Sequence, residues 1–167
     1  MKDIKTIMVA LGFSNYAQET FDYAAELSRN LGADLFIASV INVKDVEAVR
    51  KISAMGYNVD GEHYVQGIKD ERKQLLKQIL EKSPYQDDHI RIIFRVGHPV
   101  DELLKTIVKE NVDMVVMGLK GRTDLEHVLV GSVAEKLFRK SPVPVVSHRD
   151  KKSAEKLRQR LRAENTQ

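Results

Sequence analysis

The sequence has 167 residues, of which 43% are hydrophobic and 31% charged, and its formal net charge is +3. This length and apolar content fit one globular domain and exclude a disordered chain. The sequence holds 0 cysteines, which excludes disulfides and thiolate metal sites. No apolar run approaches the roughly 18 residues of a membrane span, and the start "MKDIKTIMVALGFS" lacks the features of a signal peptide. We therefore expect a cytoplasmic protein.

The positive charge is concentrated at the C-terminal end of the chain. The segment 149–167 holds seven Lys or Arg and three Asp or Glu, so the rest of the chain is almost neutral. We predict a folded domain over residues 1–148 and a basic helical tail over 149–167, whose thin apolar stripe favours a solvated helix. A nearly neutral domain lacks the basic face of a DNA-binding protein, so we predict no DNA partner.

The N-terminal part of the chain alternates strand and helix patterns. The run Ile4–Leu11 is short and apolar and is followed by Gly12, which is typical of a buried strand. Ser14 is a suitable cap for an amphipathic helix that ends before Gly32. A second strand is predicted over Leu35–Ile41.

The stretch after the second strand gives a weaker pattern. Residues Asn42–Gly67 are predicted to be irregular, with a short helix near Val46–Ser53 and an exposed excursion at "GYNVDGEHY". A charged amphipathic helix follows over Ile68–Glu81, and Pro84 ends it.

The remainder of the chain again alternates strands and helices, and its last strand pattern contains two prolines, which suit an edge strand. A parallel sheet with helices on both faces accounts for such an alternation, because parallel strands need right-handed crossovers. The predicted elements are strands at 89–97, 112–118 and 142–148, and helices from Pro99, over 132–141 and over 150–163.

The most informative motif is "GLKGRTDLEHVLVGS", residues 118–132. Gly118, Gly121 and Gly131 have the spacing G-x2-G-x9-G, and Ser132 follows where a helix is predicted to start. Ligands of open α/β sheets bind beyond the carboxyl ends of the strands, where the strand order reverses. Glycine lets the backbone approach such a ligand because it has no Cβ.

Two interpretations of this motif remain open. A helix start offers N–H groups and the positive end of the helix dipole, which favour an anion, and Lys120 and Arg122 add positive charge. The alternative is a long connection with turn glycines and a Gly-Ser cap. The motif is neither a Walker A loop nor the dinucleotide fingerprint.

The stretch "MGLKGRTDLEHVLVGSVAEKLFRKSPVPVVSH" closely resembles the nucleotide-binding branch of the universal stress proteins, and the resemblance extends over about Ile4 to His148. It implies a doubly wound, Rossmann-like α/β fold with a five-stranded parallel sheet of order 3-2-1-4-5. It also implies a homodimer joined through the last strand, Val143–Val146, and ATP, with or without Mg²⁺, as the ligand.

The resemblance further implies roles for individual residues. Gly118 and Gly121 would lie against the ribose and phosphates, and Gly131 and Ser132 would hold the phosphates through main-chain N–H groups and the hydroxyl. Val40 would border the adenine. The full set of expected nucleotide-binding residues is Ala10, Leu11, Val40, Met117, Gly118, Lys120, Gly121, Arg122, Gly131, Ser132 and Val133.

One position departs from the family pattern. Nucleotide-binding members have an Asp just after the first strand, where this sequence has Gly12. Loss of that carboxylate removes a charge-assisted hydrogen bond of about 1.5–3 kcal/mol, which corresponds to roughly tenfold to a hundredfold in affinity. Gly12 therefore favours weaker binding, a changed base preference or a different ligand.

Three functional hypotheses follow. The first is a nucleotide-dependent stress-response dimer that binds ATP or a related adenine nucleotide and acts on an unknown protein partner. The second is a dimeric interaction protein that does not bind nucleotide, for which Gly12 is the motivation. The third is a slow ATP hydrolase, which rests only on the glycine loop together with Lys120 and His98, since the sequence shows no clear general base. No metal-ligand spacing is found among the histidines, and we interpret the chain as a binding protein first.

Overall fold

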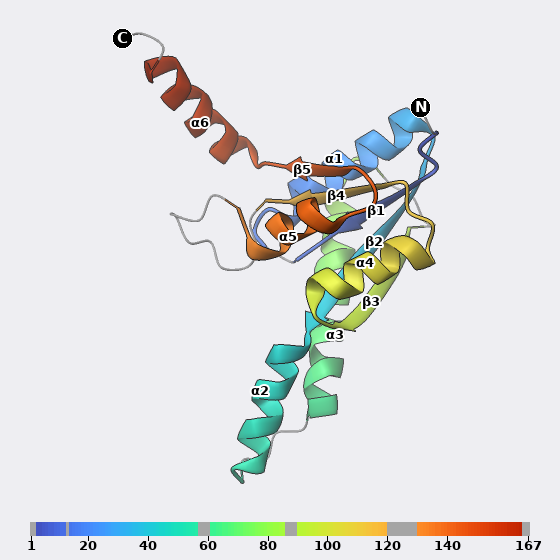
Figure 1. Cartoon of the computed structure of the whole chain (residues 1–167), viewed down its shortest axis with the longest axis vertical. Helices are drawn as coiled ribbons and strands as arrows, with labels where there is room; N and C mark the ends of the chain where they lie inside the picture. Colours follow the sequence, from blue (N-terminus) through green and yellow to red (C-terminus); the bar gives the residue numbers. More distant parts are fainter. Residues whose placement is uncertain (1–2, 13, 57–60, 86–89, 120–129, 165–167) are drawn as a thin grey trace.

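The computed structural model describes residues 3–12, 14–56, 61–85, 90–119 and 130–164. Strands and helices alternate along most of the chain (Figure 1). The elements are β1 (Thr6–Ala10), α1 (Ala17–Leu31), β2 (Asp34–Asn42), α2 (Val43–Ala54), α3 (Gly61–Lys82), β3 (Arg91–Gly97), α4 (Pro99–Lys109), β4 (Met114–Gly118), α5 (Ser132–Lys140), β5 (Val145–His148) and α6 (Lys151–Glu164).

The strands form one five-stranded sheet of order β3-β2-β1-β4-β5. Every neighbouring pair is parallel, and the register places Ala10 of β1 beside both Ala38 of β2 and Met117 of β4. The predicted fold class and strand order are therefore confirmed. The order reverses direction between β1 and β4, so this pair is the topological switch point of the sheet.

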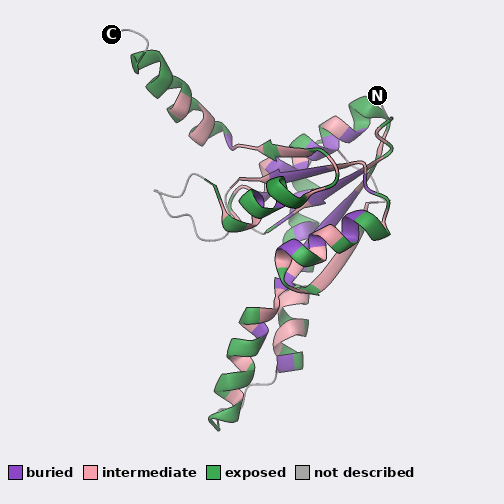
Figure 2. Ribbon diagram, viewed as in Figure 1, coloured by how far each residue is buried: buried purple, intermediate pink, exposed green. Residues whose placement is uncertain are grey.

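Two apolar layers cover the two faces of the sheet. On one face, Phe21 of α1 and Leu76 of α3 pack on Ile37 and Val116. On the other, the buried apolar residues of α4 and α5 pack on a second set of strand residues: Leu103, Ile107, Ala134 and Leu137 on Met8, Phe36, Ala38, Val115 and Met117. The strands at the centre of the sheet are accordingly buried along their length (Figure 2).

Helix α1 ends as the sequence predicts but begins differently. Gly32 follows the helix in the left-handed conformation, with φ of 64°, and its N–H donates to the Arg29 carbonyl. The residue at the N-cap is Tyr16 rather than Ser14. The Ser14 hydroxyl instead accepts from the Tyr16 N–H at 3.4 Å, so it stabilises the turn that leads into the helix.

The prediction of an irregular stretch over residues 42–67 is wrong. Most of it is helical: the Asn42 side chain accepts from the Lys44 N–H and starts α2, and α3 begins at Gly61. Residues 57–60 lie outside the described part. The helix pattern is weak because α2 and the N-terminal half of α3 project from the sheet and pack mainly on each other (Figure 1). We call these two segments the projecting helix pair.

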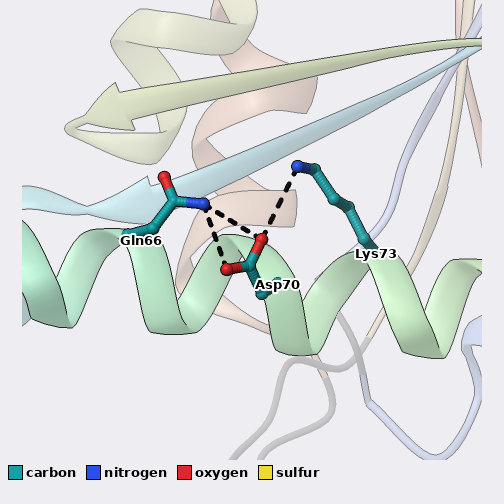
Figure 3. Close-up of polar contacts among 3 residues, drawn as sticks. All are labelled: Gln66, Asp70 and Lys73. Carbon is teal, nitrogen blue, oxygen red and sulfur yellow. Dashed lines mark hydrogen bonds and ion pairs between the residues drawn. The ribbon is translucent and has the colours of Figure 1, made fainter.

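The solvent face of α3 is held by local polar contacts. The Gln66 amide donates to both Asp70 carboxylate oxygens, and the Lys73 ammonium lies 3.6 Å from one of them (Figure 3). Such contacts between residues three and four apart stabilise a helix by a few tenths of a kcal/mol each. They account for the side of α3 that faces water, whereas the C-terminal half of the helix places Leu76 and Ile79 in the core.

Helix α6 contains no buried residue and extends away from the domain (Figures 1 and 2). The Asp150 carboxylate accepts from the Ser153 N–H at 2.8 Å and so caps its first turn. Among the residues that the structure describes, no helix is long and apolar enough to cross a membrane.

Candidate functional site

A cavity of about 480 Å³ opens at the carboxyl ends of β1, β2 and β4. Its position follows from the strand order. The chain leaves β1 and β4 toward opposite faces of the sheet, and a crevice opens between the ends of these two neighbouring strands. Gly12 and Ser14, after β1, and Leu119, after β4, line the same cavity. The prediction that these two loops open into one crevice is confirmed.

The structure brings together every expected site residue that it describes. These residues are Ala10, Leu11, Val40, Met117, Gly118, Gly131, Ser132 and Val133, and all line the cavity. Lys120, Gly121 and Arg122 lie outside the described residues.

The end of the cavity beside β4 has the geometry of an anion site. Gly131 is the N-cap of α5, and its carbonyl accepts from the Glu135 N–H at 3.0 Å. The first N–H groups of a helix have no partner within it, and those of Ser132 and Val133 lie at this end of the cavity. The positive end of the α5 dipole lies here too.

One donor differs from the expectation. The Gly131 N–H donates to the Leu119 carbonyl at 2.7 Å, so it ties the two ends of the glycine loop together. A ligand at α5 would therefore meet the N–H groups after Gly131 and the Ser132 hydroxyl. The glycine positions the helix start rather than supplying a donor of its own.

The opposite end of the cavity, beside β2, is lined mostly by small and apolar side chains. Ala10, Ala38 and Val40 come from the strands, and Leu103 of α4 faces them. A flat apolar ring could lie between these side chains, since binding cavities are mainly apolar with a few placed polar groups.

Sequence reasoning missed three polar residues of the cavity wall: Thr20, Arg72 and Asn42. Thr20 lies on the buried face of α1, where its hydroxyl donates to the Tyr16 carbonyl at 2.9 Å. Arg72 is only 5% exposed, although it stands in the charged sequence "KDERK", which is typical of a solvated helix face. Its helical spacing of four residues from the buried Leu76 is the signal that could have revealed it.

Two histidines near the strand ends differ in their surroundings. His98 occupies the N-cap of α4, is exposed and makes no side-chain capping bond. His148 of β5 stacks on Tyr23 with ring centroids 5.1 Å apart, and burial lowers its pKa, although Glu19 and Asp150 act in the opposite direction. Its Nδ1 atom is buried without a hydrogen-bond partner in the described structure.

A doubly wound parallel sheet with a cavity at the switch point, bounded on one side by the start of α5 after Gly131, defines an open α/β protein of the class whose ligand sites lie at the carboxyl ends of the strands. The model of the universal stress protein family matches residues 3–149. The chain therefore belongs to this family.

Individual relatives match most of the chain. Universal stress protein YxiE of Bacillus subtilis is 26% identical over 144 residues, which cover 84% of this chain and 95% of the relative. Universal stress protein MJ0577 of Methanocaldococcus jannaschii is 26% identical over 157 residues, which cover 89% of this chain and 97% of the relative.

Solved structures share the fold. A structure of MJ0577 superposes with a TM-score of 0.72 at 24% identity, covering 90% of this chain and 99% of the other. A universal stress protein in complex with cAMP superposes with a TM-score of 0.56 at 23% identity, covering 89% and 99%.

Proposed function

We propose that this universal stress protein binds ATP or a related adenine nucleotide in the cavity between β1 and β4. The observation that supports this proposal best is the difference between the two ends of the cavity. A helix start lies at one end, and small apolar side chains together with Arg72 and Asn42 line the other. The phosphates would accept from the N–H groups of Ser132 and Val133, and the base would lie beside Val40. That a fold neighbour was solved with cAMP agrees with this arrangement.

The polar residues that line the cavity indicate how Mg²⁺ would be coordinated. Ser14, Thr20, Asn42 and Ser132 offer uncharged oxygen atoms, and no carboxylate lines the cavity among the described residues. Mg²⁺ usually binds through one or two carboxylates together with substrate phosphates. The ion would therefore bind together with ATP, coordinated by the phosphates and by water molecules rather than by protein carboxylates.

Binding, rather than turnover, is the function that the cavity supports. Hydrolysis needs a general base within reach of the attacking water. Among the described residues that line the cavity there is no His, Asp or Glu. Occupancy by nucleotide would act by changing the residues around α5 or the dimer, and so the affinity for a protein partner.

The direct test is isothermal calorimetry of the purified protein with ATP and Mg²⁺, after identification of any co-purified small molecule by mass spectrometry. Gly131→Leu is the decisive variant. Gly131 has φ of −68° and ψ of 147°, which any residue adopts, so the substitution adds volume without backbone strain. We expect loss of binding, and unchanged affinity would contradict the proposed phosphate end.

Gly12 supports a second candidate, a dimeric interaction protein without a nucleotide. This hypothesis predicts that the purified protein contains no bound nucleotide and does not bind ATP at millimolar concentration. Micromolar ATP binding would overturn it, so the same titration separates the two candidates.

A further inference from the structure

Helix α6 is attached to the domain by its first turn. The Lys151 N–H donates to a carboxylate oxygen of Glu19 in α1 at 3.0 Å, and the Asp150 carboxylate caps the same turn. Beyond this turn the helix extends away from the sheet, and none of its described residues is buried (Figures 1 and 2). Most of the helix surface is therefore open to a partner.

The helix is strongly basic. Over Lys151–Glu164 it has six Lys or Arg and two Glu, which give a formal charge of +4. Both acids are paired within the helix: the Glu155 carboxylate lies 3.8 Å from the Arg158 guanidinium, and the Glu164 carboxylate lies 3.2 Å from Arg160. Three lysine side chains have no acidic partner among the described residues: Lys151, Lys152 and Lys156. Because the rest of the chain is almost neutral, the positive charge of the molecule is concentrated here.

An apolar stripe runs along the same helix. Ala154, Leu157 and Leu161 are three and four residues apart, so they share one side of it. Leu161 is 57% exposed. Because an α-helix turns by about 100° per residue, Arg158 and Arg160 fall on the two flanks of this stripe. An apolar stripe bordered by basic side chains is typical of a helix that lies in the interface of a membrane.

We propose that α6 is a peripheral docking element that binds a lipid surface with anionic headgroups. The stripe would enter the headgroup region, and the long side chains of Arg158 and Arg160 would reach the lipid phosphates on either side. Clusters of about four to eight Lys or Arg on an amphipathic helix are typical of such binding. The proposal does not involve the nucleotide cavity.

The charge and the stripe together favour a lipid surface over other anionic partners. A nucleic acid would attract the charge but would leave the leucines exposed to water. A stable protein interface buries roughly 1,000 Å² or more around an apolar core, and one alanine and two leucines are too few to form such a core. A lipid surface has no fixed shape to match, so it can accept a narrow stripe.

The test is co-sedimentation of the whole protein with vesicles of phosphatidylcholine and phosphatidylglycerol in equal parts, at about 0.1 M salt. Vesicles of phosphatidylcholine alone are the comparison. We expect binding to the anionic vesicles only, and the binding should weaken at about 1 M salt because the charges are then screened. Failure to bind the anionic vesicles, or equal binding to both kinds, would overturn the proposal.

A charge variant assigns the binding to α6. It carries Lys151→Gln, Lys152→Gln and Lys156→Gln, which keep good helix formers in place and touch no buried residue. Each base near an anionic surface contributes about fivefold to the affinity, so the three changes should weaken binding by about a hundredfold.

The matched control makes the same change in net charge on the exposed side of α3. It carries Lys73→Gln, Lys77→Gln and Lys82→Gln. This variant should bind the anionic vesicles nearly as the wild type does. An equal loss of binding in both triple variants would contradict α6 as the docking element.

A further variant separates a lipid surface from a purely electrostatic partner. Leu161→Gln leaves the charge unchanged and removes an apolar side chain, so it should weaken vesicle binding by about tenfold or more. Val108→Gln, at a position of α4 that is 71% exposed, is the control and should bind as wild type. An unchanged affinity of Leu161→Gln, or binding of polyuridylate RNA in place of the vesicles, would overturn the proposal.

Discussion

Gly12 is the position where the resemblance to nucleotide-binding universal stress proteins implies an Asp. It lines the cavity just after β1, and a Cβ added there would meet no atom within 4 Å. The backbone and the neighbouring side chains therefore leave room for a larger residue. Packing among the described residues therefore does not require glycine at this position.

We predict that Gly12→Asp increases the affinity for ATP with Mg²⁺ by about tenfold to a hundredfold. The reason is that the new carboxylate would accept a hydrogen bond from the nucleotide or bind the ion, which is worth about 1.5–3 kcal/mol. Calorimetric titration measures the change. Gly12→Asn provides the uncharged control, and an equal gain in both variants would show that the charge is unimportant.

His148 gives the protein a pH-dependent stability. Burial lowers its pKa in the folded state, so the unfolded chain binds the proton more readily. The free energy of unfolding should therefore fall as the pH is lowered through the usual histidine range near 6.5, and it should level off below the pKa of the folded state.

His148→Phe should reduce this pH dependence, because phenylalanine can keep the stack on Tyr23 without titrating. The measurement is urea unfolding at several values between pH 5 and pH 8. The exposed His98, replaced by Gln, is the control and should leave the profile close to wild type. A profile unchanged in His148→Phe would show that other groups cause the effect.

At the scale of elements, α3 has two halves with different neighbours. The N-terminal half packs on α2 in the projecting helix pair, whereas the C-terminal half places Leu76 and Ile79 in the core. Leu76 is 0% exposed and its neighbour Leu75 is 36% exposed. The two leucines therefore allow a comparison of burial within one helix.

We expect Leu76→Ala to lower the free energy of unfolding by about 2–5 kcal/mol, because it removes buried methyl groups and leaves a cavity. Leu75→Ala should cost less than about 1 kcal/mol. Urea unfolding checks both values. Equal costs would mean that α3 does not pack on the sheet in the manner described.

The elements also show how far the sequence can predict the structure. The apolar strand patterns, Gly32 and Pro99 predict most of the sheet and two helix boundaries, because these signals are local. The short helix predicted near Val46–Ser53 lies within α2, whereas the N-terminal half of α3 was missed because it buries few residues and its apolar spacing is weak. The glycine motif predicts the α5 end of the cavity, whereas Arg72 reaches the cavity only through tertiary packing.

At the scale of the whole molecule, β5 is an edge strand of the sheet. The Val115 N–H donates to the Pro144 carbonyl, so in the alternating parallel ladder the N–H and carbonyl groups of Val145 and Ser147 point to the open edge. An open edge can pair with a second chain. We propose that the homodimer forms through this strand, around Val143–Val146.

Ser147→Pro should therefore weaken the dimer. Proline removes one outward N–H and leaves the hydrogen bonds to β4 intact, because Ser147 does not donate to β4 in this register. Sedimentation equilibrium over a range of concentrations measures the dissociation constant. Ser147→Ala keeps the N–H and should behave as wild type, and a dimer unaffected by proline would place the interface elsewhere.

Helix α3 connects the cavity wall at Arg72 to the far end of the projecting helix pair. Eleven helical steps separate Gly61 from Arg72, a distance of about 16 Å along the helix axis. If a ligand in the cavity tilted α3 near Arg72, the displacement would therefore be larger at the far end of the projecting helix pair. Met55, the C-cap residue that directly follows α2, is 75% exposed, and the sequence has 0 cysteines. A single cysteine introduced at this position could carry a fluorophore, and a change in its fluorescence when nucleotide is added would report movement of the helix pair.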